Sequence, residues 1–303
     1  MKDKQDQKST NVAEKKALTL VPAGSLATRL RVICSAIDQA NKAERDIDII
    51  WLVNEDFPTP SDRLFTISPT YINEGVTVTI RQSNWRDTLI NTPPSRRNLF
   101  ITWPFMVFRY QRYFSLRSRE LPKDFDLNFE RLLGRKRESI LISSDVPMGP
   151  SSSKMYTALE ATVEVNNVLR SRMSGWTGNV VGVHINRNVP EGNIDDCPTE
   201  LFIRRMQKMI EEDPTVCFFI TTNSSDEKER LATLFRERVF MTYSTQEPNS
   251  QKGIIEEFGE LLALSRTRKI LSTMASPSAQ VAAEIGDIRL ETLSVFTQNS
   301  IYR

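Results

Sequence analysis

The second half of the chain alternates between short apolar runs and longer stretches with helical spacing. The apolar runs are typical of strands covered on both faces, and they lie at residues 179–185, 215–222, 239–242 and 269–273. Apolar side chains recur with helical spacing at 199–212, after Ser224, at 253–266 and at 277–285. Strict alternation of strand and helix with short links predicts a parallel, doubly wound sheet.

The first half shows a looser version of this pattern. Its strand candidates are 18–21, 48–53, 76–81, 98–102 and 139–143, with a helix after Gly24-Ser25 and a long helix at 155–173. Residues 174–178, a Gly/Trp/Gly stretch, form the predicted linker. We therefore expect an α/β protein of two Rossmann-like domains, 17–174 and 179–303, whose parallel sheets face across a cleft. The polar, charged residues 1–16 predict a disordered N-terminal tail.

Polar side chains follow three of the predicted strands of the second half. In parallel sheets, ligands bind beyond the carboxyl ends of the strands. The segments 184–188, 222–226 and 273–278 are therefore expected to meet in one cleft, which would include His184, the single histidine of the chain. A helix that starts at Pro277 with Ser276 as its N-cap would point its N-terminus into this cleft.

Composition and charge narrow the class of protein. The chain has 39% hydrophobic and 26% charged residues, as expected of a globular protein, and its net charge of +2 does not favour nucleic acid as a partner. Three irregularly spaced cysteines fit a reducing compartment, and one histidine without zinc-type cysteine spacing predicts no metal site. We see no signal peptide and no apolar run long enough to span a membrane, so we expect a cytoplasmic protein.

Several segments occur in the order and spacing of one known family. Gly182-Val183-His184 followed by Asn186-Arg187 is similar to a G-V-H-x-R-R-T-D stretch, and residues 21–37 (VPAGSLATRLRVICSAI) are similar to a G-G-L-G-N-R-L-R-A-I turn and helix. Further matching segments are PTELFIRRMQKM at 198–209, FFITTN at 218–223, LLALSRT at 261–267 and SPSAQVAAEIG at 276–286. Together they resemble the fucosyltransferases of the NodZ and α1,6 type and, more distantly, the protein O-fucosyltransferases, which carry a shorter H-x-R.

The resemblance implies a glycosyltransferase of the GT-B fold. It implies transfer of fucose from GDP-fucose to a glycan or another hydroxyl acceptor, with inversion and without a metal ion or other cofactor. The C-terminal half would hold the nucleotide sugar. A leaving GDP gains negative charge on its β-phosphate, which arginines and helix N-termini must stabilise when no metal is present.

The resemblance also assigns candidate residues to the two halves of the cleft. His184 and Arg187 would line the donor pocket, and Asn186 stands where the family has a phosphate-binding arginine. The other candidates are Ser276 and Ser278 for the pyrophosphate, Asp226 or Glu260 for the base or ribose, and Gly24, Ser25 and Arg29 on the N-terminal side.

The sequence departs from the family pattern at the donor residues. The H-x-R arginine falls at Asn186, the T-D pair at Asn188-Val189, and an acidic pair after the following strand at Asn223-Ser224. Arg187 is no simple substitute, because neighbouring residues on a strand point to opposite faces. Losing a charge-assisted contact to the leaving phosphate costs a few kcal/mol, or on the order of a hundredfold in rate.

These departures leave three hypotheses. The protein transfers fucose, or it transfers a related sugar from a changed donor. Alternatively, it is a catalytically impaired relative that binds a nucleotide, a glycan or a partner protein. Asn186→Arg separates an enzyme from a binder, because a restored charge should raise transfer only in an enzyme.

Other motifs are explained more simply by folding. Residues 103–120 interleave aromatic side chains with arginines, which fits an amphipathic segment with buried rings better than a carbohydrate or nucleic-acid surface. The basic clusters at 134–138 and 266–269 are expected to be solvated, and residues 151–153 (SSS) to form a loop. No G-x-S-x-G, G-x-G-x-x-G or G-x-x-x-x-G-K-[ST] motif occurs, so hydrolase, nicotinamide and P-loop functions lack support.

Overall fold

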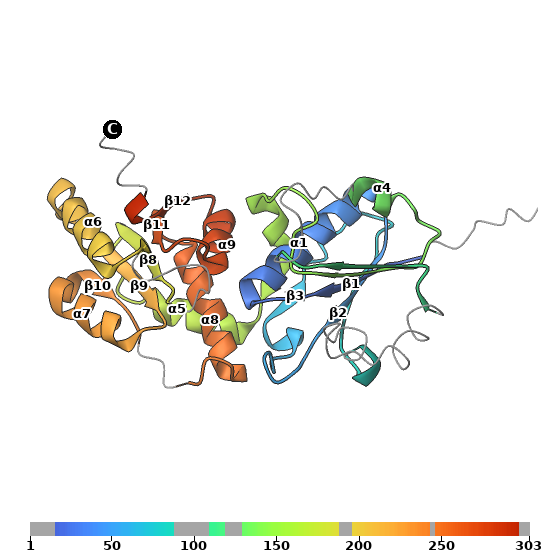
Figure 1. Cartoon of the computed structure of the whole chain (residues 1–303), viewed down its shortest axis with the longest axis horizontal. Helices are drawn as coiled ribbons and strands as arrows, with labels where there is room; N and C mark the ends of the chain where they lie inside the picture. Colours follow the sequence, from blue (N-terminus) through green and yellow to red (C-terminus); the bar gives the residue numbers. More distant parts are fainter. Residues whose placement is uncertain (1–15, 88–108, 119–128, 188–195, 243–245, 297–303) are drawn as a thin grey trace, which may run out of the picture.

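Two parallel sheets form the two halves of the molecule (Figure 1). The computed structural model describes residues 16–87, 109–118, 129–187, 196–242 and 246–296. In the first sheet the strands lie in the order β4-β2-β1-β6-β5, and in the second in the order β10-β9-β8-β11-β12. The chain is therefore mixed α/β with a GT-B-like fold, as the sequence predicts.

The strands and helices have the following bounds. The first sheet contains β1 Leu18–Pro22, β2 Ile47–Trp51, β4 Val78–Gln82, β5 Arg112–Leu116 and β6 Ile140–Ser144. The second contains β8 Val180–Ile185, β9 Cys217–Thr222, β10 Val239–Phe240, β11 Lys269–Ser272 and β12 Arg289–Thr292. An antiparallel pair joins β3 Phe65–Ile67 to β7 Leu159–Ala161. The helices are α1 Leu26–Ala43, α4 Phe129–Leu133, α5 Val163–Arg172, α6 Thr199–Glu212, α7 Ser225–Phe235, α8 Gln251–Leu264 and α9 Pro277–Gly286, with 3-10 turns η1 Ser61–Arg63, η3 Ser153–Ala158 and η5 Arg236–Arg238.

One predicted helix is wrong. The stretch 155–173 is divided into η3, β7 and α5. The division follows from two local causes: β7 pairs with β3, and Thr162 caps a new helix by accepting the Val165 N–H at 3.4 Å. Strands β5 and β12 are additional to the predicted elements, while the strand candidate at 98–102 lies outside the described residues.

Helices cover both faces of the second sheet. On one face, Phe202 and Met206 of α6 and Leu231 of α7 form an apolar cluster with Val183 and Ile185 of β8. On the other face, the apolar residues of α8 and α9 pack together with Val180, Phe219 and Ile270 of the sheet. The alternation along β8 therefore decides which helices each of its side chains meets.

Helices also connect the two halves. Ile254, Ile255 and Phe258 of α8 belong to the apolar cluster that contains the first sheet, and α8 lies between the halves in Figure 1. Helix α1 contacts α9 through an ion pair of 3.1 Å between Arg31 and Glu284. Helix α5, which precedes the predicted linker, packs against α8 of the C-terminal half. A domain boundary at 174–179 stays a prediction.

Among the helices formed by the described residues, none combines the length and the apolar character that a membrane crossing requires.

Candidate functional site: the carboxyl edge of the second sheet

The structure brings together the three polar segments that follow β8, β9 and β11. The register of the sheet places His184 beside Thr221 of β9 and Ser272 of β11. Beyond the strands, the Asn186 N–H donates to Thr273 Oγ1 at 3.2 Å, and Asn223 Nδ2 donates to Asn186 Oδ1 at 3.0 Å. The carboxyl edge of this sheet is therefore a continuous polar surface, as the rule for parallel sheets predicts.

His184 is half-buried at this edge and faces the α8/α9 side of the sheet. Its Nδ1 lies 2.8 Å from Thr221 Oγ1, whereas its Nε2 is buried without a hydrogen-bond partner among the described residues. Burial lowers the pKa of His184 to about 4. The imidazole is therefore neutral at pH 7, so it acts as a hydrogen-bonding group and makes a poor general base.

Arg187 lies on the opposite side of the strand. Its Nε donates to Glu227 Oε1 at 2.7 Å, its Nη1 to the Cys197 carbonyl at 2.7 Å and its Nη2 to Thr199 Oγ1 at 3.1 Å. The Arg187 and Glu227 side chains are only 11% and 12% exposed. The guanidinium thus connects the end of β8 to α6 and α7, and Glu227 compensates its charge. A role for Arg187 in the donor pocket stays a prediction.

Helix α9 begins at the same edge. The buried Ser276 caps it by accepting the Ala279 N–H at 3.4 Å, and Pro277 has no N–H to offer, which leaves Ser278 as the donor of the first turn. Ala275, just before the cap, has a φ of 52°, in the left-handed region that residues with a Cβ seldom adopt. Strain of this kind is often found at functional sites, where the surrounding structure holds the chain in place.

The candidate residues of the N-terminal half lie where β1 leads into α1. Gly24 has a φ of 87°, which favours glycine, and Ser25 caps α1 by accepting the Thr28 N–H at 3.4 Å. Arg29 is 5% exposed and donates from Nε to the Gly24 carbonyl at 3.0 Å and from Nη1 to the Leu52 carbonyl at 2.8 Å.

Two aromatic rings flank the guanidinium of Arg29. Its Cζ lies 5.1 Å from the ring centre of Trp51 and 4.1 Å from that of Phe57. No carboxylate of the described residues forms an ion pair with it, and burial lowers the pKa of Arg29 to about 10. Arg29 is therefore positively charged at pH 7, and no carboxylate of the described residues neutralises it.

The two acidic candidates lie apart from each other. Asp226 is exposed on the first turn of α7, three residues after Asn223. Glu260 faces α5, where its Oε1 accepts from Arg172 Nε at 3.1 Å. Burial raises the pKa of Glu260, although Arg172 opposes the shift. The structure thus places Asp226 near the polar edge and engages Glu260 in the contact between α5 and α8.

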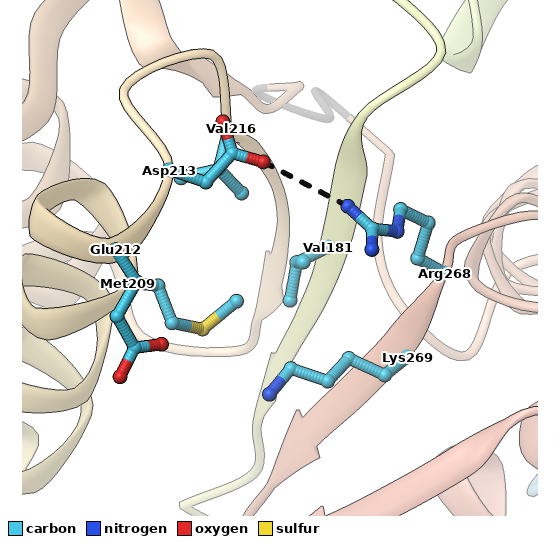
Figure 2. A pocket seen from close by; sticks show the side chains of 7 residues that line it. All are labelled: Val181, Met209, Glu212, Asp213, Val216, Arg268 and Lys269. Atoms are coloured by element: carbon cyan, nitrogen blue, oxygen red, sulfur yellow. Dashed lines mark ion pairs between the residues drawn. The ribbon is translucent and has the colours of Figure 1, made fainter.

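A cavity of about 270 Å³ lies at the opposite, amino edge of the second sheet (Figure 2). Arg268 and Lys269 line it together with Glu212 and Asp213, besides Val181, Met209 and Val216. Arg268 is 3.9 Å from Asp213, and Lys269 pairs with Glu291 at 3.1 Å. Because these charges are paired and ligands of parallel sheets bind at the carboxyl edge, we place the candidate site at the polar edge.

Thr221, which the sequence did not single out, completes the polar edge together with Thr273 and Asn223 of the predicted segments. Thr221, Thr273 and Asn223 supply the hydrogen bonds that hold His184, Asn186 and the Arg187 N–H. The register between β8 and β9 identifies Thr221, because it pairs with His184, but the sequence alone does not give that register. Around the described site residues, no group of three or more His, Cys, Asp or Glu side chains is placed to hold a metal ion.

The basic and aromatic motifs of the sequence serve folding in the described part of the chain. Arg112 forms an ion pair with Glu138, which also pairs with Arg135 at 2.9 Å. Tyr110 and Leu116 are buried. Residues 109–118 therefore form an amphipathic segment around the edge strand β5, as predicted, while 103–108 and 119–120 lie outside the described residues.

Comparison with solved structures connects the fold of this chain to one group of enzymes. The chain matches NodZ α-1,6-fucosyltransferase soaked with GDP-fucose with a TM-score of 0.57 and 14% identity, covering 89% of this chain and 93% of that one. The fold is fucosyltransferase-like. A structure of fucosyltransferase NodZ from Bradyrhizobium matches with a TM-score of 0.54 at the same identity, over 89% of this chain and 93% of that one.

Two further fucosyltransferases share the fold. POFUT1 in complex with GDP-fucose matches with a TM-score of 0.56 and 11% identity, over 91% of this chain and 98% of that one. A variant of Arabidopsis thaliana FUT1 in complex with GDP matches with a TM-score of 0.59 and 11% identity, over 92% of this chain and 70% of that one. No protein-family model and no curated protein sequence matches the chain.

Proposed function

We propose that this fucosyltransferase-like protein binds a GDP-sugar at the carboxyl edge of its second sheet and transfers the sugar, fucose or a related one, to a hydroxyl acceptor. The observation that carries the proposal is the convergence of Asn186, Asn223, Thr273 and Ser276 at this edge, in a fold whose neighbours were solved with GDP or GDP-fucose. The N-terminal half, with Arg29 beside the start of α1, is proposed to face the acceptor.

The proposed reaction is a displacement at the anomeric carbon of the sugar. An acceptor hydroxyl attacks that carbon, the bond from the carbon to the β-phosphate oxygen breaks, and GDP leaves with the bonding electrons. The acceptor proton passes to a base or to solvent, and the configuration at the carbon inverts. Metal-independent transfer requires hydrogen-bond donors to stabilise the leaving oxygen. Ser276, Ser278 and Asn186 are the groups that we propose for this role.

Nucleotide binding tests the proposal through two serine N-caps. Ser276 caps α9 at the polar edge, and Ser250 caps α8 by accepting the Gly253 N–H at 3.0 Å. Replacing either with alanine removes one cap and costs about 1 kcal/mol of stability. Calorimetric titration with GDP and GDP-fucose should show about tenfold weaker binding for Ser276→Ala, the effect of one hydrogen bond to a charged group.

Ser250→Ala is the control that separates a lost nucleotide contact from a lost helix cap. Ser250→Ala should bind both nucleotides like the wild type, because its cap belongs to a helix whose first turns pack with the first sheet. If neither nucleotide binds the wild-type protein at millimolar concentration, the donor assignment is wrong. Equal losses in the two variants would mean that affinity follows stability, not a contact with Ser276.

A second function, binding without transfer, is favoured by one specific observation. The one arginine that directly follows Asn186 is committed to Glu227 on the other face of the sheet. A transfer assay with GDP-fucose, water and candidate hydroxyl acceptors separates the two functions. Asn186→Arg should raise transfer if the protein is a weakened enzyme. A pure binder would show no turnover with either side chain.

A further inference from the structure

The polar edge of the second sheet has a distinctive charge pattern. Among the described residues that follow β8, β9 and β11, namely 186–187, 223–224 and 273–276, Arg187 is the only cation. Its side chain is directed to the α6/α7 face and neutralised by Glu227, at a contact of 2.5 Å between Arg187 Nη2 and Glu227 Oε1. The α8/α9 side of the edge therefore presents amides, hydroxyls and an imidazole.

On the α8/α9 side of the polar edge, the polar groups of the described residues include a neutral imidazole and two amides. His184 has a buried Nε2 without a hydrogen-bond partner among the described residues, and its Nδ1 lies 2.8 Å from Thr221 Oγ1, so the imidazole meets no charged group of that part of the chain. Asn186 and Asn223 are joined side chain to side chain at 3.0 Å, and the Asn223 Oδ1 accepts the Arg187 N–H at 2.9 Å. These contacts fix the amides in place without adding charge.

We infer that this edge recognises the phosphate oxygens of its nucleotide ligand with uncharged hydrogen-bond donors only, so that a nucleoside diphosphate binds here without an ion pair. The inference rests on the proposed function and specifies the chemistry of that same site. The donors are those of the proposed function, Asn186, Ser276 and Ser278, together with Thr273. Asn186 is the position at which one substitution would change the recognition from neutral to ionic.

The physical signature of neutral recognition is weak dependence on salt. Ions in solution screen a contact between a cation and a phosphate, whereas they change a hydrogen bond between an uncharged donor and a phosphate much less. The affinity for GDP should therefore change less than about twofold between about 50 and 500 mM NaCl. GDP should bind about tenfold more tightly than GMP, the effect of one hydrogen bond to the charged β-phosphate, and this ratio should also change little with salt.

Calorimetric titrations of GDP and GMP at the two salt concentrations test the inference, with Asn186→Arg as the decisive variant. This variant should bind GDP about tenfold more tightly at low salt, the fold-change of one charge-assisted hydrogen bond, and lose that gain at high salt. Gln207→Arg, on an exposed position of α6, adds the same charge away from the edge and should leave affinity and salt dependence unchanged.

The outcomes separate the inference from the function on which it rests. GDP binding that falls steeply with salt in the wild-type protein would overturn neutral recognition and leave the proposed function standing. Binding of GDP by Asn186→Arg but not by the wild-type protein would overturn both, because the edge would then need an added charge to hold a nucleotide. Failure of both proteins to bind either nucleotide would overturn the proposed function and the inference together.

Discussion

One largely buried arginine lies near the carboxyl edge of each sheet, Arg29 on α1 and Arg187 after β8, and the two differ in how their charge is balanced. Arg187 forms an ion pair with Glu227 and also donates to Cys197 and Thr199. Arg29 donates to two carbonyls and lies against two aromatic rings, without an ion-pair partner among the described residues. The first is a structural connection within the C-terminal half, and the second is a positive charge without a counter-charge among the described residues at the start of α1.

The difference between the two arginines indicates which of them could form an ion pair with a bound anion. A buried charge without a partner is unfavourable, and a bound anion relieves that cost. In this molecule the uncompensated Arg29 lies on α1 of the N-terminal half, whereas the described residues that directly follow β8, β9 and β11 hold no cation other than the paired Arg187. The fold therefore resembles that of its fucosyltransferase neighbours, while the charge at its second sheet differs from the H-x-R pattern that the sequence resembles.

The largest expected effect comes from breaking the ion pair. Arg187→Met leaves Glu227 buried without its cation and should destabilise the protein by about 4 kcal/mol, as is typical when one partner of a buried pair is removed. Urea denaturation measures this loss. The double variant Arg187→Met/Glu227→Gln should recover a large part of it, because no buried charge is then left unpaired.

Arg29→Met is the matched control for that prediction. It removes a buried cation that has no ion-pair partner in the described structure, so it should cost less than half as much as Arg187→Met, and the cost should come from the two carbonyls left without a donor. Equal costs for the two variants would contradict the distinction between the arginines.

A buried carboxylate without a cation partner should make the stability of the protein depend on pH. Burial, and then the neighbouring Glu260, raises the pKa of Glu257 on α8 from 4.5 to about 7. Between these values the folded protein holds a proton that the unfolded chain has lost, so stability falls as the pH rises from about 4.5 to 7. The full cost above pH 7 is about 3 kcal/mol.

Glu257→Gln isolates this effect because glutamine does not titrate. The variant should gain stability relative to the wild type as the pH rises from about 4.5 to 8, by about 3 kcal/mol in total, in denaturation curves measured along the series. A difference between variant and wild type that does not change with pH would show that Glu257 titrates normally.

The elements that the sequence predicts well are those whose causes are local. Helix α6 has the predicted bounds, because its apolar stripe is regular and Asp213-Pro214 follows it. The cap of α9 at Ser276 and the convergence of the three strand ends also follow from local signals combined with the rule for parallel sheets.

The elements that the sequence misses depend on contacts with distant residues. Strands β5 and β12 are edge strands. β12 (RLET) has charged, half-exposed side chains that give little apolar signal, whereas β5 (RYFSL) lies within a segment whose alternating rings and arginines indicate amphipathic character without fixing a strand. β7 resembles part of a helix until its partner β3 is known. The direction of Arg187 could be anticipated from the alternation of a strand, but its partner Glu227 is forty residues away in the sequence.

Hydrogen exchange with and without GDP, read by mass spectrometry, tests the central claim most directly, because it reports where the nucleotide binds. The account predicts that GDP protects peptides covering 184–187, 221–224 and 273–279, the ends of β8, β9 and β11 with the start of α9. Peptides covering 209–216 and 266–269, around the cavity at the amino edge, should exchange unchanged. Protection at the amino edge alone would contradict the account and transfer the site to the other side of the sheet.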